Sequence, residues 1–115
     1  DADGEVFMVL GASGGSTIIS SCIQVFLNIV EYGMDPQEAV AAPRMHHQWI
    51  PEEMFLEPET PSDVVDALRV KGHKIIQKLA FSSVQVTVRT NNGQLEAGAD
   101  PRKGGWPASI QTIDN

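Results

Sequence analysis

The residues best suited to chemistry are two adjacent glycines, Gly14 and Gly15, in the run Gly11-Ala12-Ser13-Gly14-Gly15-Ser16. A strand-like segment precedes this run and a helical pattern follows it. Glycine leaves its backbone N–H unshielded, and free N–H groups at the start of a helix attract negative charge. The pair could therefore stabilise the oxyanion of an acyl-transfer reaction. It could also hold a phosphate, or form a tight turn that only packs the helix against the strand.

The phosphate interpretation lacks the residues that usually accompany it. No lysine follows the glycines as in a Walker motif, and their spacing differs from G-x-G-x-x-G. The formal net charge is −7, and 8 Lys and Arg residues are the only ones available to neutralise phosphates. Such a field repels a polyanion, so we expect no nucleic-acid partner.

Two adjacent histidines, His46 and His47, could at first sight bind a metal. The side chains of neighbours in an extended segment point opposite ways, so one ion rarely takes both. No acidic or cysteine residue completes a ligand set at a familiar spacing. We therefore expect histidines that pack and form hydrogen bonds, and neither a metal nor a cofactor. The single cysteine, Cys22, lies among apolar residues, which favours burial over reactivity.

Two charged segments remain. The run at 100–105, Asp-Pro-Arg-Lys-Gly-Gly, is predicted to be a turn whose charges favour structural ion pairing over the binding of an anion. A solvated loop is predicted where four glutamates surround two prolines, and these glutamates are Glu52, Glu53, Glu57 and Glu59. Such a loop gives no basis for paired catalytic carboxylates.

The elements that must position the glycines begin with a strand over 5–10, which is rich in strand formers. A tight turn is predicted for 11–15, because helices disfavour paired glycines and the strand has no reason to continue through them. Ser16 or Thr17 then caps a helix over 17–32.

This helix has a wide apolar surface, which indicates cover on more than one side. One face carries Ile19, Ile23, Phe26 and Val30, and Ile18, Cys22, Val25 and Ile29 widen it. The opposing polar stripe consists of Thr17, Ser20, Ser21, Gln24, Asn28 and Glu31. Gly33 ends the helix.

Further elements follow downstream. Asp35 caps a short helix that ends before Pro43, and four prolines exclude long regular structure from 43–61. Ser62 caps a third helix over 63–71, which Gly72 ends. Strands are predicted over 73–79, 84–90 and 94–99, the last two joined by a hairpin turn at 91–93, and 100–115 is predicted to be loop.

The order of elements is typical of an α+β protein. An open sheet edge at 5–10 and a start without Met indicate a piece of a larger protein, so we expect 1–115 to form a single partial domain. The hydrophobic content of 42% is compatible with a packed core. No segment reaches the ~20 apolar residues of a membrane span.

Taken together, four motifs resemble the γ-glutamyltranspeptidase family over nearly the whole chain. The family's G-[SA]-x-G-G-[ST] turn is matched at 11–16 and its Q-[VM]-x-x-N-like stretch at 24–28. A-x-x-A-P-R-x-H-x-Q is matched at 39–48, and [SA]-D-P-R with a Lys-Gly-Gly extension at 99–105. Each motif alone is weak, but four in this order and spacing are specific. Ser13 stands where many members have proline or alanine.

The resemblance implies an α+β fold that is part of a four-layer αββα N-terminal-nucleophile hydrolase sandwich. Members are made as a precursor that cuts itself into a large and a small subunit, and this chain corresponds to the C-terminal part of the small subunit. The small subunit's N-terminal threonine attacks the γ-glutamyl amide of glutathione and related compounds. The γ-glutamyl group then passes to water, an amino acid or a dipeptide. Gly14 and Gly15 correspond to the family's oxyanion-hole glycines, which bind the substrate through their backbone N–H groups.

In the family the nucleophilic threonine, and a serine pair that holds the substrate's α-carboxylate, lie upstream of the glycine turn and hence outside this sequence. The resemblance therefore implies that 1–115 supplies the oxyanion hole, is inactive alone, and needs the large subunit and the upstream part of the small subunit. It also suggests an extracellular, periplasmic or outward-facing membrane-anchored location. Two alternatives stay open: a non-catalytic relative, and a small anion-binding module that uses the glycine turn.

Overall fold

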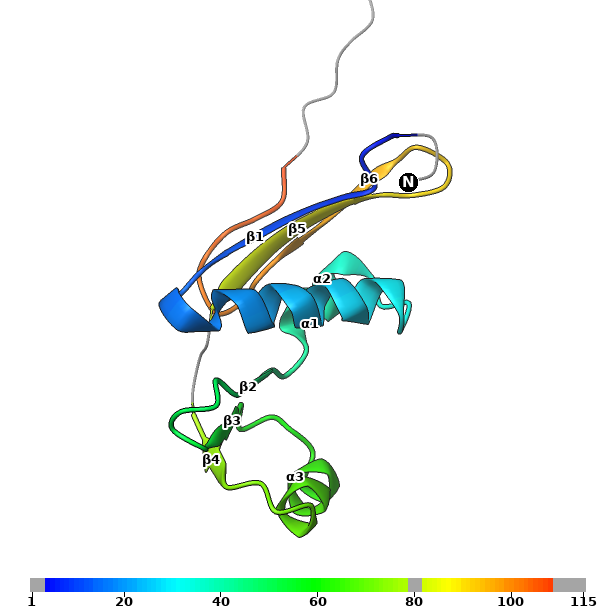
Figure 1. Ribbon diagram of the computed structural model, residues 1–115. Helices are drawn as coiled ribbons and strands as arrows, with labels where there is room; N and C mark the ends of the chain where they lie inside the picture. Colours follow the sequence, from blue (N-terminus) through cyan, green and yellow to red (C-terminus); the bar gives the residue numbers. More distant parts are fainter. Residues whose placement is uncertain (1–3, 79–81, 109–115) are drawn as a thin grey trace, which may run out of the picture.

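A computed structural model describes residues 4–78 and 82–108 of the chain. Its larger unit is an antiparallel sheet in the order β1-β5-β6, with two helices, α1 (Ile18–Val30) and α2 (Pro36–Ala41), on one face (Figure 1). The strands are β1 (Met8–Ser13), β5 (Ser83–Arg89) and β6 (Leu95–Ala99). The predicted α+β class is confirmed. Among the described residues, no helix has the length and apolarity needed to cross a bilayer.

The core of this unit lies between the sheet and the helices. Val84, Val86 and Val88 point from β5 towards Val25 of α1 and Val40 of α2, and all five side chains are at most 7% exposed. The period of two predicted for this strand is confirmed, since the residues between them are exposed or half-buried. The hairpin at 91–93 is also confirmed, because β5 and β6 pair with Arg89 opposite Leu95.

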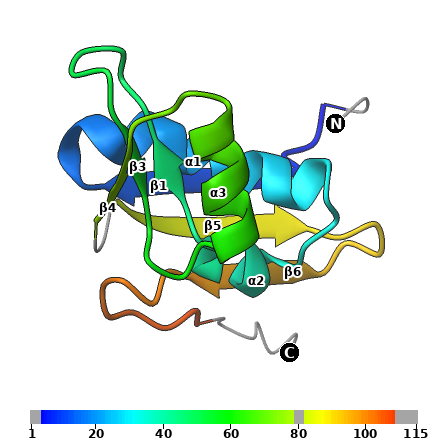
Figure 2. The same ribbon diagram turned by 90° about the horizontal axis from the view of Figure 1, so that it is seen from below.

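A smaller unit lies beyond the helices, where the prolines of 43–61 predicted no long regular structure. It holds a second sheet in the order β2-β3-β4, packed against α3 (Ser62–Val70) (Figure 2). Its strands are short: β2 (Met45–His46), β3 (Met54–Leu56) and β4 (Ile75–Gln77). Of the strand predicted over 73–79, Leu79 lies outside the described residues, as do 1–3 and 109–115.

β1 covers Met8–Ser13, so it begins and ends three residues later than the strand predicted over 5–10. The strand continues through Gly11 and Ala12 to Ser13, with Gly11 opposite Gln85 and Ser13 opposite Ser83. The prediction was wrong because strand pairing uses backbone groups, which glycine supplies as well as any residue. The turn begins at Gly14, where the backbone has a φ of 144°.

Part of the apolar surface predicted for the first helix is uncovered in this structure, and part of its predicted polar stripe is buried. Ile19 is 72% exposed and Ile23 53% exposed, whereas Ser21 and Val25 are buried. Two amide side chains of the polar stripe bind backbone groups of neighbouring segments, since Gln24 bonds both backbone groups of Met45 and Asn28 donates to Ala39 O. Periodicity identifies two faces but does not say which partner covers each.

The predicted second helix is confirmed. Asp35 forms a capping box with Glu38, and α2 stops before Pro43. α2 also approaches β6 very closely, because a Cβ on Gly98 would lie 2.2 Å from Pro36 O. The predicted third helix is confirmed as α3, with Gly72 at a φ of 92° after its end, but the cap was wrong: Pro61 precedes the helix and Ser62 is its first residue.

Candidate oxyanion site

The glycine turn connects the end of β1 to the start of α1. Gly14 has φ 144°, and Gly15, with φ 71°, opens a single 3-10 turn (Gly15–Thr17) that leads into the helix. Both conformations favour glycine, because other residues rarely adopt a φ in this range. Both glycines are exposed. The turn therefore presents its backbone at the surface, at the N-terminal end of a 13-residue helix.

The N–H groups of the two glycines have no acceptor within the part of the chain that the structure describes. The first turn of α1 carries no acidic side chain that would compete with an anion. Two adjacent donors at a helix start, where the peptide dipoles add a partial positive charge, are suited to a developing oxyanion.

The turn rests on Ser82, which is completely buried. A Cβ on Gly14 would lie 2.7 Å from Ser82 Cα, so the two backbones are in direct contact. Thr17, at the end of the 3-10 turn, donates from Oγ1 to Gly14 O at 3.1 Å and lies 2.6 Å from Ser82 Oγ. No sequence motif drew attention to Ser82, whose role depends on a partner 65 residues away.

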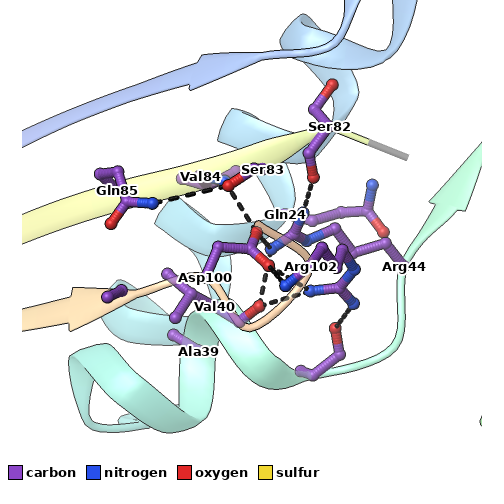
Figure 3. A network of polar contacts seen from close by, with 12 residues as sticks. Gln24, Ala39, Val40, Arg44, Ser82, Ser83, Val84, Gln85, Asp100 and Arg102 are labelled. Atoms are coloured by element: carbon purple, nitrogen blue, oxygen red, sulfur yellow. Dashed lines mark hydrogen bonds and ion pairs between the residues drawn. The ribbon is translucent and has the colours of Figure 1, made fainter. Parts of the chain in front are cut away.

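Ser82 is held in turn by a buried arginine. Arg44 donates from Nη1 to Ser82 O at 2.5 Å and from Nη2 to Val40 O at 2.6 Å (Figure 3). The same Nη2 lies 2.5 Å from Asp100 Oδ2, and both side chains are at most 1% exposed. Asp100 Oδ2 also accepts from Val84 N at 2.7 Å. Arg44 therefore joins the segment that supports the glycine turn to α2, and through Asp100 to β5.

A second arginine extends the same cluster. Arg102 donates from Nε to Glu57 Oε1 at 2.6 Å, and its Nη2 forms an ion pair with Glu57 Oε2. Its Nη1 lies 3.1 Å from Asp100 Oδ1, and Arg44 N donates to Glu57 Oε2 at 2.9 Å. We call Arg44, Glu57, Asp100 and Arg102 the arginine–carboxylate cluster. Its two positive and two negative side chains balance.

These contacts test two of the sequence predictions. Ion pairing within the run at 100–105 is confirmed. The solvated loop was wrong for Glu57, which is 2% exposed, because its two arginine partners replace the water that a carboxylate needs. Lys103 makes no ion pair among the described residues and donates from Nζ to Ser13 Oγ at 2.7 Å.

The cluster shifts the protonation of two of its members. Burial alone would raise the pKa of Asp100, but hydrogen bonds from Val84 N, Arg102 N and the Arg44 guanidinium outweigh it and lower the pKa below its ordinary value. Burial opposes the charge of Arg102, yet its bonds to Glu57 and Asp100 prevail and raise its pKa. Both groups are therefore charged at neutral pH.

Both adjacent histidines form hydrogen bonds, as predicted, but only His46 is buried. His46 is 6% exposed and its ring nitrogens contact Ser20 Oγ at 2.8 Å and Gln48 Oε1 at 3.0 Å. His47 is exposed and accepts from Trp49 N. Within the described part of the chain, His, Cys, Asp and Glu side chains form no group of three that could hold a metal. Cys22 is half-buried, and desolvation raises the pKa of its thiol, although the charge of Arg44 opposes this.

Comparison with known proteins places these features in a family context. The family model for γ-glutamyltranspeptidase matches residues 1–110. The chain is 39% identical over 100 residues to the glutathione hydrolase proenzyme of Escherichia coli, covering 87% of this chain and 17% of that protein. It is 38% identical over 103 residues to scoloptoxin SSD14 of Scolopendra dehaani, covering 89% of this chain and 18% of that protein. The chain thus spans about a sixth of the length of these two relatives.

Solved structures agree with the sequence matches. The γ-glutamyltranspeptidase of Pseudomonas nitroreducens in complex with L-DON superposes with a TM-score of 0.85 at 32% identity, covering 95% of this chain and 58% of that one. The T380A mutant of the Helicobacter pylori γ-glutamyltranspeptidase gives 0.81 at 38% identity, covering 88% and 56%.

Proposed function

The chain belongs to the γ-glutamyltranspeptidase family, and we propose that it supplies the oxyanion hole of an enzyme that transfers γ-glutamyl groups. Gly14 and Gly15 provide the donors, through their backbone N–H groups. The substrate is the γ-glutamyl amide of glutathione or a related compound. The product of the first step passes its γ-glutamyl group to water, an amino acid or a dipeptide.

One observation carries the proposal. Within the described residues, the two glycine N–H groups have no acceptor, and they lie exposed where β1 meets the N-terminal end of α1. When substrate and partner segments exclude water from a site, each N–H group without an acceptor costs free energy. An anionic oxygen that accepts from both N–H groups removes this cost. Their partial positive charge stabilises an oxygen most when that oxygen becomes negative during the reaction.

The chemistry that follows is acyl transfer. A threonine hydroxyl, supplied from outside residues 1–115, attacks the γ-carbonyl carbon, and its proton passes to a base. The carbonyl electron pair moves to oxygen, which accepts hydrogen bonds from the two glycine N–H groups. When the oxyanion collapses, the C–N bond breaks and the protonated amine leaves. A γ-glutamyl ester remains, and water or an amine resolves it through a second oxyanion at the same donors.

The fold supports this assignment of parts. The N-terminal-nucleophile hydrolase fold expected from the sequence is confirmed by solved members at 32% and 38% identity. In its αββα arrangement, β1, β5 and β6 would belong to one sheet, and α1 and α2 to the helical layer on one face of that sheet. Partners are proposed to be the large subunit and the upstream part of the small subunit. The exposed apolar residues of α1 support such partners, because a helix face of this kind is stable when covered.

The test uses the full-length protein that contains this chain. We expect it to release glutamate from glutathione, and we expect purified 1–115 to release none. A full-length protein that carries an N-terminal threonine after processing, yet turns over no γ-glutamyl amide, would favour a non-catalytic relative. Binding of inorganic phosphate to Gly14 and Gly15 in such an inactive protein, seen as amide chemical-shift changes, would favour the anion-binding module.

A further inference from the structure

We infer that Thr17 and Ser82 are positioning residues that aim the N–H of Gly15 at the oxyanion. This inference rests on the proposed function, because it concerns the direction of one of the two donors. It starts from the hydroxyl pair beneath the glycine turn, in which Thr17 Oγ1 lies 2.6 Å from Ser82 Oγ.

The direction of each hydrogen bond in the pair follows from proton counting. A threonine hydroxyl has a single proton, and Thr17 donates it to Gly14 O at 3.1 Å. Ser82 must therefore be the donor in the contact between the two hydroxyls. The buried Ser82 hydroxyl holds the Thr17 hydroxyl, and the Thr17 hydroxyl holds the carbonyl of Gly14.

Holding this carbonyl fixes the direction of the next amide. Gly14 C=O and Gly15 N–H belong to one planar peptide group, and this bond is trans. In a trans peptide the N–H points opposite to the C=O. A carbonyl that points towards Thr17 therefore turns the Gly15 N–H in the opposite direction, away from Thr17.

The two donor N–H groups are consequently oriented by different contacts. The N–H of Gly14 follows Ser13, whose position is set by pairing with Ser83 at the end of β1. The N–H of Gly15 depends on the Thr17 hydroxyl, because glycine at a φ of 71° has no side chain to restrict rotation of the peptide. Loss of the hydroxyl should thus misalign one donor and leave the other in place.

The test compares variants of the full-length protein with γ-glutamyl-4-nitroanilide as substrate. T17V removes the hydroxyl while keeping the side-chain shape, T17S keeps the hydroxyl, and S82A removes the second hydroxyl. T60V is the matched control, because Thr60 is half-buried and its hydroxyl makes no hydrogen bond among the described residues. Trapping of the acyl-enzyme gives the fraction of competent sites, so that rate constants are expressed per site.

We expect T17V to lower the acylation rate constant per site about tenfold, which is part of the ~10²–10³-fold loss typical of a missing oxyanion donor. KM should change less than about twofold, because the ground-state carbonyl gains little from the donor. S82A should give a smaller loss in the same rate constant, while T17S and T60V should match the unaltered protein.

Three results would overturn the inference. T17V could match the unaltered protein per site, T17S could lose as much as T17V, or the loss could appear only as fewer competent sites. Each result would show that the Thr17 hydroxyl does not orient the Gly15 N–H for catalysis. An unaltered protein without γ-glutamyl turnover is a different result, because it removes the proposed function itself and this inference with it.

Discussion

Arg44 and Asp100 are 56 residues apart in the sequence, and their side chains meet at 2.5 Å with almost no exposure to solvent. Arg44 comes from the segment that follows α2, and Asp100 comes directly after β6. The same guanidinium binds the carbonyl of Ser82, against which Gly14 is packed. The two charged motifs of the sequence are therefore one structural unit, and that unit supports the glycine turn.

Replacing Arg44 by methionine should strongly destabilise the protein. Asp100 would keep Arg102 as a partner but would lose its shortest ion pair in a buried position. Breaking a buried pair in this way costs about 3–5 kcal/mol. The measurement is the free energy of unfolding of the full-length protein in urea. R69M is the control, because its exposed pair with Asp66 should be worth less than about 1 kcal/mol. Equal effects of R44M and R69M would contradict a structural role for the cluster.

Asp100 should make stability depend on pH in the acidic range. Its pKa is lower in the folded protein than in the unfolded chain, so the unfolded chain binds the proton more readily. The stabilisation that Asp100 contributes is fully present above its ordinary pKa of about 4. It is lost as the pH falls through the lower pKa that Asp100 has in the folded protein. We expect D100N to be less stable than the unaltered protein at pH 7 and to lose less stability between about pH 5 and pH 2. Thermal melts across this range give the comparison, and parallel curves for the two proteins would refute it.

The two glycines of the turn should respond differently to alanine. At Gly14 a Cβ would lie 2.7 Å from the backbone of Ser82, so the turn must move. At Gly15 no atom lies within 4 Å of such a Cβ, and only the left-handed conformation opposes alanine, at about 1–2 kcal/mol. We expect G14A to lose more than ~100-fold in turnover per competent site, and G15A about tenfold or less, given the cost of a lost donor. A greater loss in G15A would show that the contact with Ser82 does not set the geometry.

The contact between α2 and β6 should be equally intolerant of a side chain. A methyl group on Gly98 would lie 2.2 Å from Pro36 O, a backbone atom that moves only with its helix. We expect G98A to lower the free energy of unfolding by at least ~1–3 kcal/mol, the usual range for overpacking. G105A is the control, since its new methyl group meets no atom within 4 Å. The expectation fails if the two variants unfold at the same urea concentration.

Local signals were sufficient for several parts of the fold. The capping box at Asp35 and the alternating valines of β5 act over a few residues, and both were predictable. A turn at the glycine pair was also predictable, because helices disfavour paired glycines. The path of β1 through Gly11 was not, since pairing with β5 decides it.

The remaining features depend on partners that are distant in the sequence. Glu57 lies among other glutamates, and nothing local indicates that it is buried against Arg102, 45 residues away. Ser82 has an unremarkable neighbourhood in the sequence and acquires its role from Thr17 and Arg44. The buried face of α1 follows from the backbone groups that Gln24 and Asn28 find in other segments. Each of these requires the folded arrangement.

The most direct test of the proposed oxyanion hole is a crystal structure of the full-length protein trapped with a γ-glutamyl analogue that forms a tetrahedral adduct. The expected result is an adduct oxygen within hydrogen-bond distance, about 2.7–3.1 Å, of both Gly14 N and Gly15 N. An adduct oxygen bound by other groups, with the two glycine amides hydrogen-bonded to the protein itself, would contradict the proposal.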